Sequence, residues 1–182
     1  MRIIAGEWRG RPLRAPEGLA TRPTADRTRE TLFNMLASRL GSFDELAVAD
    51  LFAGSGALGL EALSRGAATC LFAENDAPAV RALRANIAAL RAQDRCDVRA
   101  GSALALGPAR APLDLILLDP PYGSGAGAVA LDKLSRLGWT SPATWIAIET
   151  GKDETVAVKG FEVEATRDVG KARLHLLRPA SA

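Results

Sequence analysis

The chain has 182 residues, of which 48% are hydrophobic and 24% are charged, and its formal net charge is +2. These values are ordinary for a soluble globular protein with one real core, and they exclude a strong overall electrostatic field. No stretch of the sequence approaches the roughly 18 apolar residues that a membrane span requires, so we expect no membrane association.

Two cysteines, Cys70 and Cys96, each lie in a predicted strand. We interpret both as buried thiols in a reducing cytosol. The N-terminus lacks the apolar segment of a signal peptide, and we therefore expect a cytoplasmic location. We favour a monomer, and no metal site is expected.

The first 20 residues are predicted to form a basic arm or hairpin, and residues 21–182 a single domain. Residues 1–40 hold eight arginines and four acidic residues, a net charge of +4, so the rest of the chain carries −2. A basic arm on a near-neutral body suggests a polyanionic partner, or else a solvated charged surface. Trp8 lies between basic residues, which suits either nucleic-acid binding or packing of the arm onto the body.

Residues 22–30 lead into a helix that Thr24 or Asp26 is expected to cap. Its buried stripe is predicted at helical spacing: Thr28, Leu32, Phe33, Leu36 and Leu40. Positive charge near a helix start opposes the helix dipole, so arginines placed there suggest an external phosphate or carboxylate partner. These arginines are Arg22, Arg27 and Arg29.

A glycine-rich loop follows the first predicted strand, residues 47–52, and opens a helix that runs to Arg65. Its glycines fit the G-x-G-x-x-G spacing of a nucleotide-binding loop, in which the backbone turns tightly and approaches a ligand. They are Gly54, Gly56 and Gly59. Asp50 precedes the loop by four residues, where its carboxylate can reach a ligand ammonium group.

The second predicted strand, residues 69–73, ends in Glu74, which lies 20 residues after Gly54. An acidic residue at this distance binds a ribose diol in nucleotide-binding folds. Asp76 is expected to cap the following helix. A third strand, residues 96–100, leads to Gly101, Ser102 and Ala103.

The most informative stretch runs from Asp114 to Tyr122. Residues 115–118 read as a strand buried on both faces, which Pro120 and Pro121 end because neither donates a backbone hydrogen bond. Asp119 is thereby held at the carboxyl edge of the sheet. A carboxylate, the freed Pro120 carbonyl and the Tyr122 ring suit an exocyclic amine on a flat base. The alternative is a strand end in which Asp119 is a cap and Tyr122 is packing.

The remaining elements complete an α/β pattern. A loop over residues 123–127 is predicted to precede a helix at 129–137 and a strand at 144–149, and residues 155–164 and 172–177 are predicted to form an antiparallel pair. His175 in the last strand is interpreted as structural. The alternation predicts a doubly wound, mostly parallel seven-stranded sheet with an antiparallel C-terminal hairpin and a small N-terminal β arm.

The glycine loop and Glu74 suit either NAD or S-adenosylmethionine. Asp50, the acid-Pro-Pro-Tyr turn and the lack of a placed His or Lys acid favour S-adenosylmethionine. The motifs resemble those of class I S-adenosylmethionine-dependent amino-methyltransferases with a Rossmann-like fold. More narrowly, the chain resembles the RsmD family of bacterial 16S rRNA guanine-N2 methyltransferases. Residues 6–11, 22–30 and 59–67 carry this resemblance.

The resemblance implies a role for each matching position. Gly54 and Gly56 would pass the methionine part of the cofactor, and Glu74 would bind its ribose. Ser102, with Ala103 beside it, stands where such enzymes often have an Asp that contacts the adenine amine. Asp119, the Pro120 carbonyl and Tyr122 would hold the target base. The expected RNA contacts are Arg9, Arg11, Arg22, Arg27 and Arg29.

The predicted function is methyl transfer to the N2 amine of a guanine in 16S rRNA, on a small-subunit particle. A DNA amino-methyltransferase would share the motifs, but 182 residues leave little room for a recognition domain. A protein glutamine methyltransferase usually has Asn in place of Asp119. An NAD oxidoreductase and a non-catalytic ribosome-binding protein are the alternatives from other classes.

Overall fold

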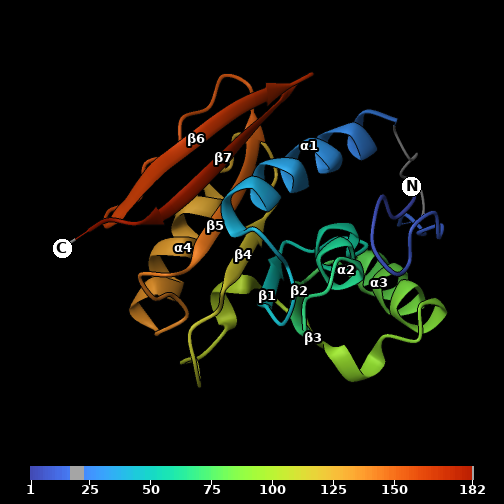
Figure 1. The fold of residues 1–182 in the computed structure, drawn as a ribbon. Coiled ribbons are helices and arrows are strands. Elements are labelled where there is room, and N and C mark those ends of the chain that lie inside the picture. The colour runs from blue at the N-terminus through green and yellow to red at the C-terminus, as the bar shows by residue number, and fades with distance from the viewer. Residues whose placement is uncertain (17–22, 182) are drawn as a thin grey trace.

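The computed structural model describes residues 1–16 and 23–181, so Arg22 and the boundary expected between residues 20 and 21 lie outside the described residues. A seven-stranded sheet with strand order β3-β2-β1-β4-β5-β7-β6 forms the middle of the molecule (Figure 1). The strands are β1 (Ala47–Leu51), β2 (Thr69–Glu74), β3 (Cys96–Ala100), β4 (Leu115–Leu118), β5 (Trp145–Gly151), β6 (Phe161–Val169) and β7 (Ala172–Pro179). The α-helices are α1 (Pro23–Leu40), α2 (Ala57–Ser64), α3 (Ala77–Ala89) and α4 (Ala126–Arg136).

Strands β1 to β5 pair in parallel, and β7 pairs antiparallel with both β5 and β6. This confirms the predicted fold class. Strand β6 was predicted at residues 155–164 and lies instead at Phe161–Val169. The reason is its pairing with β7, since Val169 lies opposite Ala172 across a tight turn that contains Gly170.

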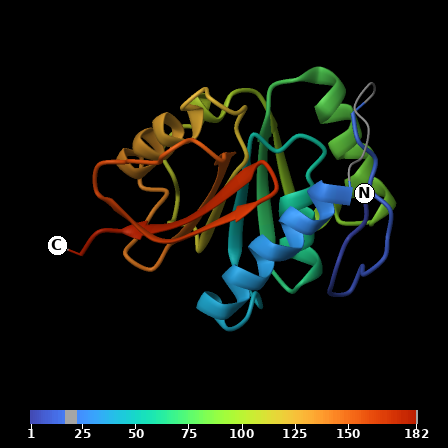
Figure 2. The same ribbon diagram turned by 90° about the horizontal axis from the view of Figure 1, so that it is seen from above.

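Helices cover both faces of the sheet (Figure 2). Helices α1, α2 and α3 pack with the N-terminal arm on one face, and α4 packs on the other. The central strands are buried on both faces, so β4 is apolar at every position and its successive side chains enter the two cores in turn. Within the described residues, the central strands therefore have their ends, and not their faces, free to form a site.

The N-terminal arm folds back on itself and joins the main core. Arg2 and Pro12 form an antiparallel bridge, as the hairpin prediction requires. Trp8 is only 9% exposed, and the guanidinium of Arg95 lies 5.2 Å from the centre of its ring. Of the two interpretations of Trp8, the structure supports packing of the arm onto the body.

Helix α1 begins earlier than the sequence suggested. Its first described residue is Pro23, so the backbone of Thr24 and Asp26 lies within the helix and not at its N-cap position. Proline favours the first helical position because its fixed backbone angle suits the helix and its missing N–H is not needed there. Asp26 instead pairs with Arg29 one turn later, at 3.2 Å.

No helix within the described residues is long and apolar enough to cross a membrane.

Candidate active site

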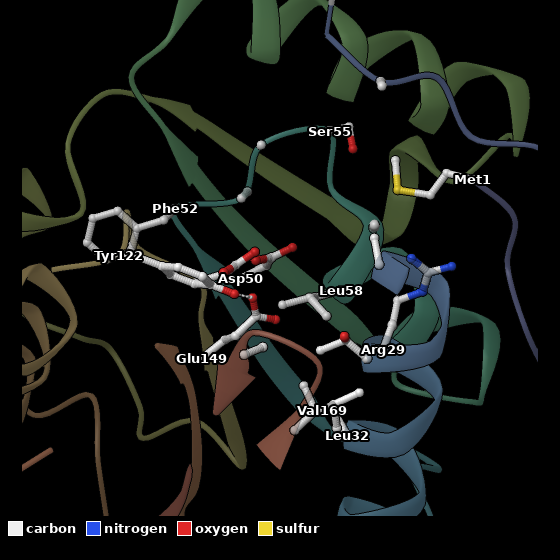
Figure 3. Close-up of a pocket in the computed structure, with 18 of the residues that line it drawn as sticks. Met1, Arg29, Leu32, Asp50, Phe52, Ser55, Leu58, Tyr122, Glu149 and Val169 are labelled. Carbon is white, nitrogen blue, oxygen red and sulfur yellow. Dashed lines mark hydrogen bonds between the residues drawn. The ribbon is translucent and has the colours of Figure 1, made fainter. Parts of the chain in front are cut away.

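The candidate site lies between the parallel strands β1 and β4, where the order in which the strands were added to the sheet reverses. Strands β2 and β3 lie on one side of β1 in the sheet, and β4 and β5 lie on the other. Doubly wound sheets bind ligands at such a point, beyond the carboxyl ends of the strands. A cavity of about 820 Å³ opens there, walled by the arm, α1, the glycine loop and the β6–β7 turn (Figure 3).

Asp50 lies at the floor of this cavity and is almost fully buried, at 1% exposure. Its Oδ2 accepts a hydrogen bond from the N–H of Gly59 at 2.9 Å, whereas its Oδ1 has no hydrogen-bond partner among the described residues. Burial raises the pKa of Asp50 to about 8; the bond from Gly59 lowers it and the charge of Glu74 adds to the rise. A buried acceptor without a partner on a cavity wall is suited to a ligand that carries a donor or a positive charge.

The glycine loop divides into a part that faces the cavity and a part that packs. Gly54, with φ of 57°, lines the cavity, and a Cβ added there would meet no atom within 4 Å. A Cβ on Gly56 would lie 2.3 Å from Cδ1 of Leu83 on α3. Gly54 alone therefore offers its bare backbone to a ligand, while Gly56, expected beside the cofactor, allows close packing of the loop on α3.

Glu74 is the last residue of β2, and Ser102 and Ala103 follow β3; none of the three is among the described residues that line the cavity. Glu74 accepts hydrogen bonds from the N–H of Gly54 at 2.7 Å and of Asp76 at 2.9 Å. Ser102 accepts one from the N–H of Leu104, and Ala103 is buried. Glu74 thus fixes the loop that shapes the cavity, and the three ligand contacts stay predictions.

Asp119, Tyr122 and Glu149, which we call the acidic cluster, all line the cavity, and Figure 3 shows Tyr122 and Glu149 next to each other. The hydroxyl of Tyr122 donates to Oε2 of Glu149 at 2.8 Å. Asp119 is exposed where it opens onto the cavity, and the protein that surrounds the cavity limits its hydration. Its loss of hydration and the charges of Glu149 and Asp50 raise its pKa, and burial also raises the pKa of Glu149 and of Tyr122.

Sequence reasoning identified Asp119 and Tyr122 but not Glu149. A signal for Glu149 was present, since the strand predicted at residues 144–149 ends in it, and Asp119 follows the strand predicted at residues 115–118. The two strands pair in parallel, with Leu118 beside Ile148. The residues that follow these two, Asp119 and Glu149, therefore reach the same side of the sheet. Neighbouring parallel strands that both end in an acid predict a pair of carboxylates.

The arginines expected to bind RNA divide into two groups. Arg9, Arg11 and Arg27 are exposed, and Arg11 also donates to the carbonyl of Ala89. Arg29 is only 3% exposed and forms an ion pair with Glu61. Its guanidinium is held inside the protein at the cavity wall, so the structure contradicts a surface role for Arg29.

Three polar residues that the sequence did not single out hold the arm against the cavity. Glu61 accepts from the N–H groups of Ile4 and Ala5, and Ser64 accepts from that of Trp8. Asn86 on α3 donates to the carbonyls of Arg14 and Ser55 and so links the arm to the glycine loop. All three are buried on helices whose apolar spacing gave no indication of a polar contact.

The strand order, the antiparallel C-terminal pair and the acid-Pro-Pro-Tyr turn beside a glycine loop define an S-adenosylmethionine-dependent class I methyltransferase. A solved Escherichia coli structure assigned as a methyltransferase, yhhF, aligns with a TM-score of 0.85 and 35% identity over 100% of this chain and 99% of that one. A magnesium protoporphyrin IX methyltransferase from Synechocystis, solved with bound S-adenosylmethionine, has the same fold at a TM-score of 0.67 and 13% identity, over 90% and 87% of the two chains.

The family follows from the sequence comparisons. A model of the family described as Conserved hypothetical protein 95 matches residues 1–178. Ribosomal RNA small subunit methyltransferase D of Escherichia coli is 40% identical over 150 residues, which are 82% of this chain and 74% of that protein. The chain belongs to this family, the RsmD methyltransferases, as its sequence motifs predicted.

Proposed function

We propose that the protein methylates the exocyclic N2 amine of a guanine in 16S rRNA, presented on a small-subunit particle. The observation that carries this proposal is the acidic cluster at the carboxyl end of β4, which opens onto the same cavity as Asp50 and Gly54. The similar Escherichia coli protein is named for methylation of small-subunit ribosomal RNA, which supports the substrate class.

The described residues fit the cofactor. S-adenosylmethionine supplies an electrophilic methyl carbon on its sulfonium, so the protein's main task is to align an amine with it. The unpartnered Oδ1 of Asp50 is suited to accept from the ammonium group of the methionine part. Because Gly54 has no side chain, its backbone can approach the methionine part of the cofactor closely. We assign the ribose contact to Glu74 and the adenine contact to Ser102 and Ala103.

Asp119, the Pro120 carbonyl and Tyr122 are assigned to the target base. The N2 amine of guanine is a weak nucleophile because its lone pair is delocalised into the ring. Hydrogen bonds from this amine to Asp119 and to the Pro120 carbonyl favour a more pyramidal nitrogen and stabilise the positive charge that develops on it. The half-exposed ring of Tyr122 is free to stack on the base, which must leave its own stack to enter.

The surface beside the cavity is suited to an RNA backbone. Arg9 and Arg11 on the arm and Arg27 on α1 are exposed and lie on elements that wall the cavity. So few phosphate contacts contribute modest affinity, which favours an assembled particle over naked RNA. We also propose that the protein acts as a monomer in the cytoplasm.

The test uses S-adenosylmethionine with a labelled methyl group. Unmodified small ribosomal subunits, naked 16S rRNA and duplex DNA are offered in parallel, and the RNA or DNA is digested to identify the methylated nucleoside. We expect N2-methylguanosine, with more transfer to subunits than to naked rRNA. Methyl-adenine or methyl-cytosine in DNA would instead identify a DNA enzyme, and transfer to none of the three would indicate a binding protein.

The variant Asp119→Asn tests the residue that carries the proposal. Loss of one charge-stabilising group from an active site typically lowers the rate by about 10²–10³-fold, and we expect a loss of this size while the affinity for S-adenosylmethionine is kept. Asp132→Asn on α4 is the matched control, because Asp132 pairs with Arg136 and does not line the cavity. Full activity of Asp119→Asn would remove Asp119 from the reaction.

A further inference from the structure

Asp119 and Glu149 form a pair of hydrogen-bond acceptors at one edge of the sheet. They follow Leu118 and Ile148, which lie side by side in β4 and β5, so both carboxylates face the cavity at the same level. The Tyr122 hydroxyl donates to Oε2 of Glu149. The carboxyl groups of Asp119 and Glu149 also lie within hydrogen-bond reach of each other, so a base that donates to both would replace this contact. Within the described part of the chain, neither carboxylate forms an ion pair with a basic side chain.

Two adjacent acceptors match one base better than the others. The Watson–Crick edge of guanine presents the N1–H donor directly beside the N2 amine. Adenine and cytosine present an acceptor nitrogen beside their amine, which would face a carboxylate lone pair without a proton between them. A site built to accept two neighbouring hydrogen bonds rejects a ligand that lacks one of the donors, because a buried acceptor is then left unpaired.

We propose that Glu149 is a specificity-determining residue, which accepts the N1–H of the target guanine while Asp119 accepts from its N2 amine. This inference rests on the proposed function and names the group that selects the base. Tyr122 then has two tasks: its ring stacks on the base, and its hydroxyl orients Glu149. The competing interpretation is that Glu149 serves only to position Tyr122.

The two interpretations differ in how they treat 2-aminopurine. This base keeps the N2 amine that receives the methyl group, but its N1 is an acceptor and carries no hydrogen. If Glu149 reads N1–H, the wild-type protein prefers guanine by about 10- to 100-fold, the usual effect of one unmatched hydrogen bond. If Glu149 only positions Tyr122, a change at Glu149 slows both bases equally.

The experiment compares methyl transfer to the two bases in small subunits. The target nucleotide is first mapped with the wild-type protein, and subunits are then rebuilt with 16S rRNA ligated to carry guanine or 2-aminopurine there. In Glu149→Gln the amide oxygen accepts from Tyr122 and the NH2 group faces the base, where it pairs with N1 of 2-aminopurine. We expect the preference for guanine to fall to about threefold or less.

Glu154→Gln is the matched control, since Glu154 bonds to the N–H of Gly151 and lies outside the cavity wall. It should keep the wild-type preference. If Glu149→Gln is too slow for rates, the ratio of the two dissociation constants for the same particles gives the comparison. An unchanged ratio would overturn the role of Glu149 and leave the proposed function intact, whereas failure of the wild-type protein to methylate guanine would overturn the function itself.

Discussion

Arg29 on α1 and Glu61 on α2 form a buried ion pair, with Nε of the arginine 3.3 Å from Oε1 of the glutamate. Glu61 also accepts from the N–H groups of Ile4 and Ala5 and from Nε of Arg65. One carboxylate thus joins the arm to α1 and α2. Because the arm and α1 wall the cavity, this ion pair supports the site without touching its floor.

Glu61→Gln should destabilise the protein by about 3 kcal/mol, because it removes the buried counter-ion of Arg29 and leaves the partly exposed Asp26 as its ion-pair partner. The free energy of unfolding is measured by urea denaturation. Glu30→Gln is the control, since Glu30 is exposed on α1, and it should change this free energy by less than about 0.5 kcal/mol. Equal midpoints for Glu61→Gln and wild type would show that the ion pair contributes nothing net.

Much of the fold could be predicted, because the apolar runs in the sequence coincide with buried strands, and the capping and turn residues coincide with the ends of helices and strands. Strands β3 and β4 lie where the sequence placed them, and Asp76 caps α3 through the N–H of Ala79 as expected. The register of β6 could not be predicted, because most of its side chains are exposed and its position is set by pairing with β7.

The candidate site was predictable where it lies at a strand end and unpredictable where it depends on packing between helices. Asp50 and Asp119 follow from the rule that parallel strands present ligands at their carboxyl ends. The burial of Arg29 could not be read from the sequence, because its partner Glu61 lies 32 residues away on another helix. The different roles of Gly54 and Gly56 could not be read from the sequence either, because they depend on the packing of Gly56 against Leu83 on α3.

The two glycines of the loop should respond differently to alanine. In Gly54→Ala the added methyl group meets no protein atom but enters the cavity. It should cost about 1 kcal/mol of stability through its left-handed backbone and weaken S-adenosylmethionine binding by at least tenfold. Gly56→Ala should lower the stability further, because its methyl group collides with Leu83.

Calorimetric titration with S-adenosylmethionine and urea denaturation separate the two effects. Gly101 is a control position, since a Cβ there also meets nothing within 4 Å and Gly101 does not line the cavity. Gly101→Ala should therefore keep the cofactor affinity. If Gly54→Ala bound S-adenosylmethionine as tightly as wild type does, the cofactor would not pass this part of the loop.

The exposed arginines of the arm should contribute affinity for RNA without sequence preference. Each phosphate contact removed by Arg9→Ala or Arg11→Ala should lower the slope of log affinity against log salt by about 0.7–0.9 in magnitude. Binding to small subunits is measured across a series of salt concentrations. Arg110→Ala is the control, because Arg110 is exposed and precedes the amino end of β4, whereas the cavity lies beyond the carboxyl ends of the strands. A slope unchanged in both arm variants would exclude phosphate contacts there.

Asp50 should make the stability of the cofactor-free protein depend on pH. Its pKa is about 8 in the folded protein, against about 3.9 in an unfolded chain. Between these values the folded state binds one proton more than the unfolded state, so the free energy of unfolding falls as pH rises from about 4 to 8. Above pH 8 the carboxylate is ionised in both states and the loss is complete.

Asp50→Asn removes this dependence. Relative to wild type, the variant should gain stability from pH 5 to pH 8, by an amount on the order of a few kcal/mol, as measured by urea denaturation without cofactor. Asp94→Asn, at an exposed position, should show no such trend. Addition of S-adenosylmethionine should reverse the order at pH 8, because its ammonium group stabilises the ionised Asp50 and gains less from the amide. A difference between Asp50→Asn and wild type that stays constant across this range would mean that Asp50 is ionised in the free protein, already paired with a donor inside the cavity.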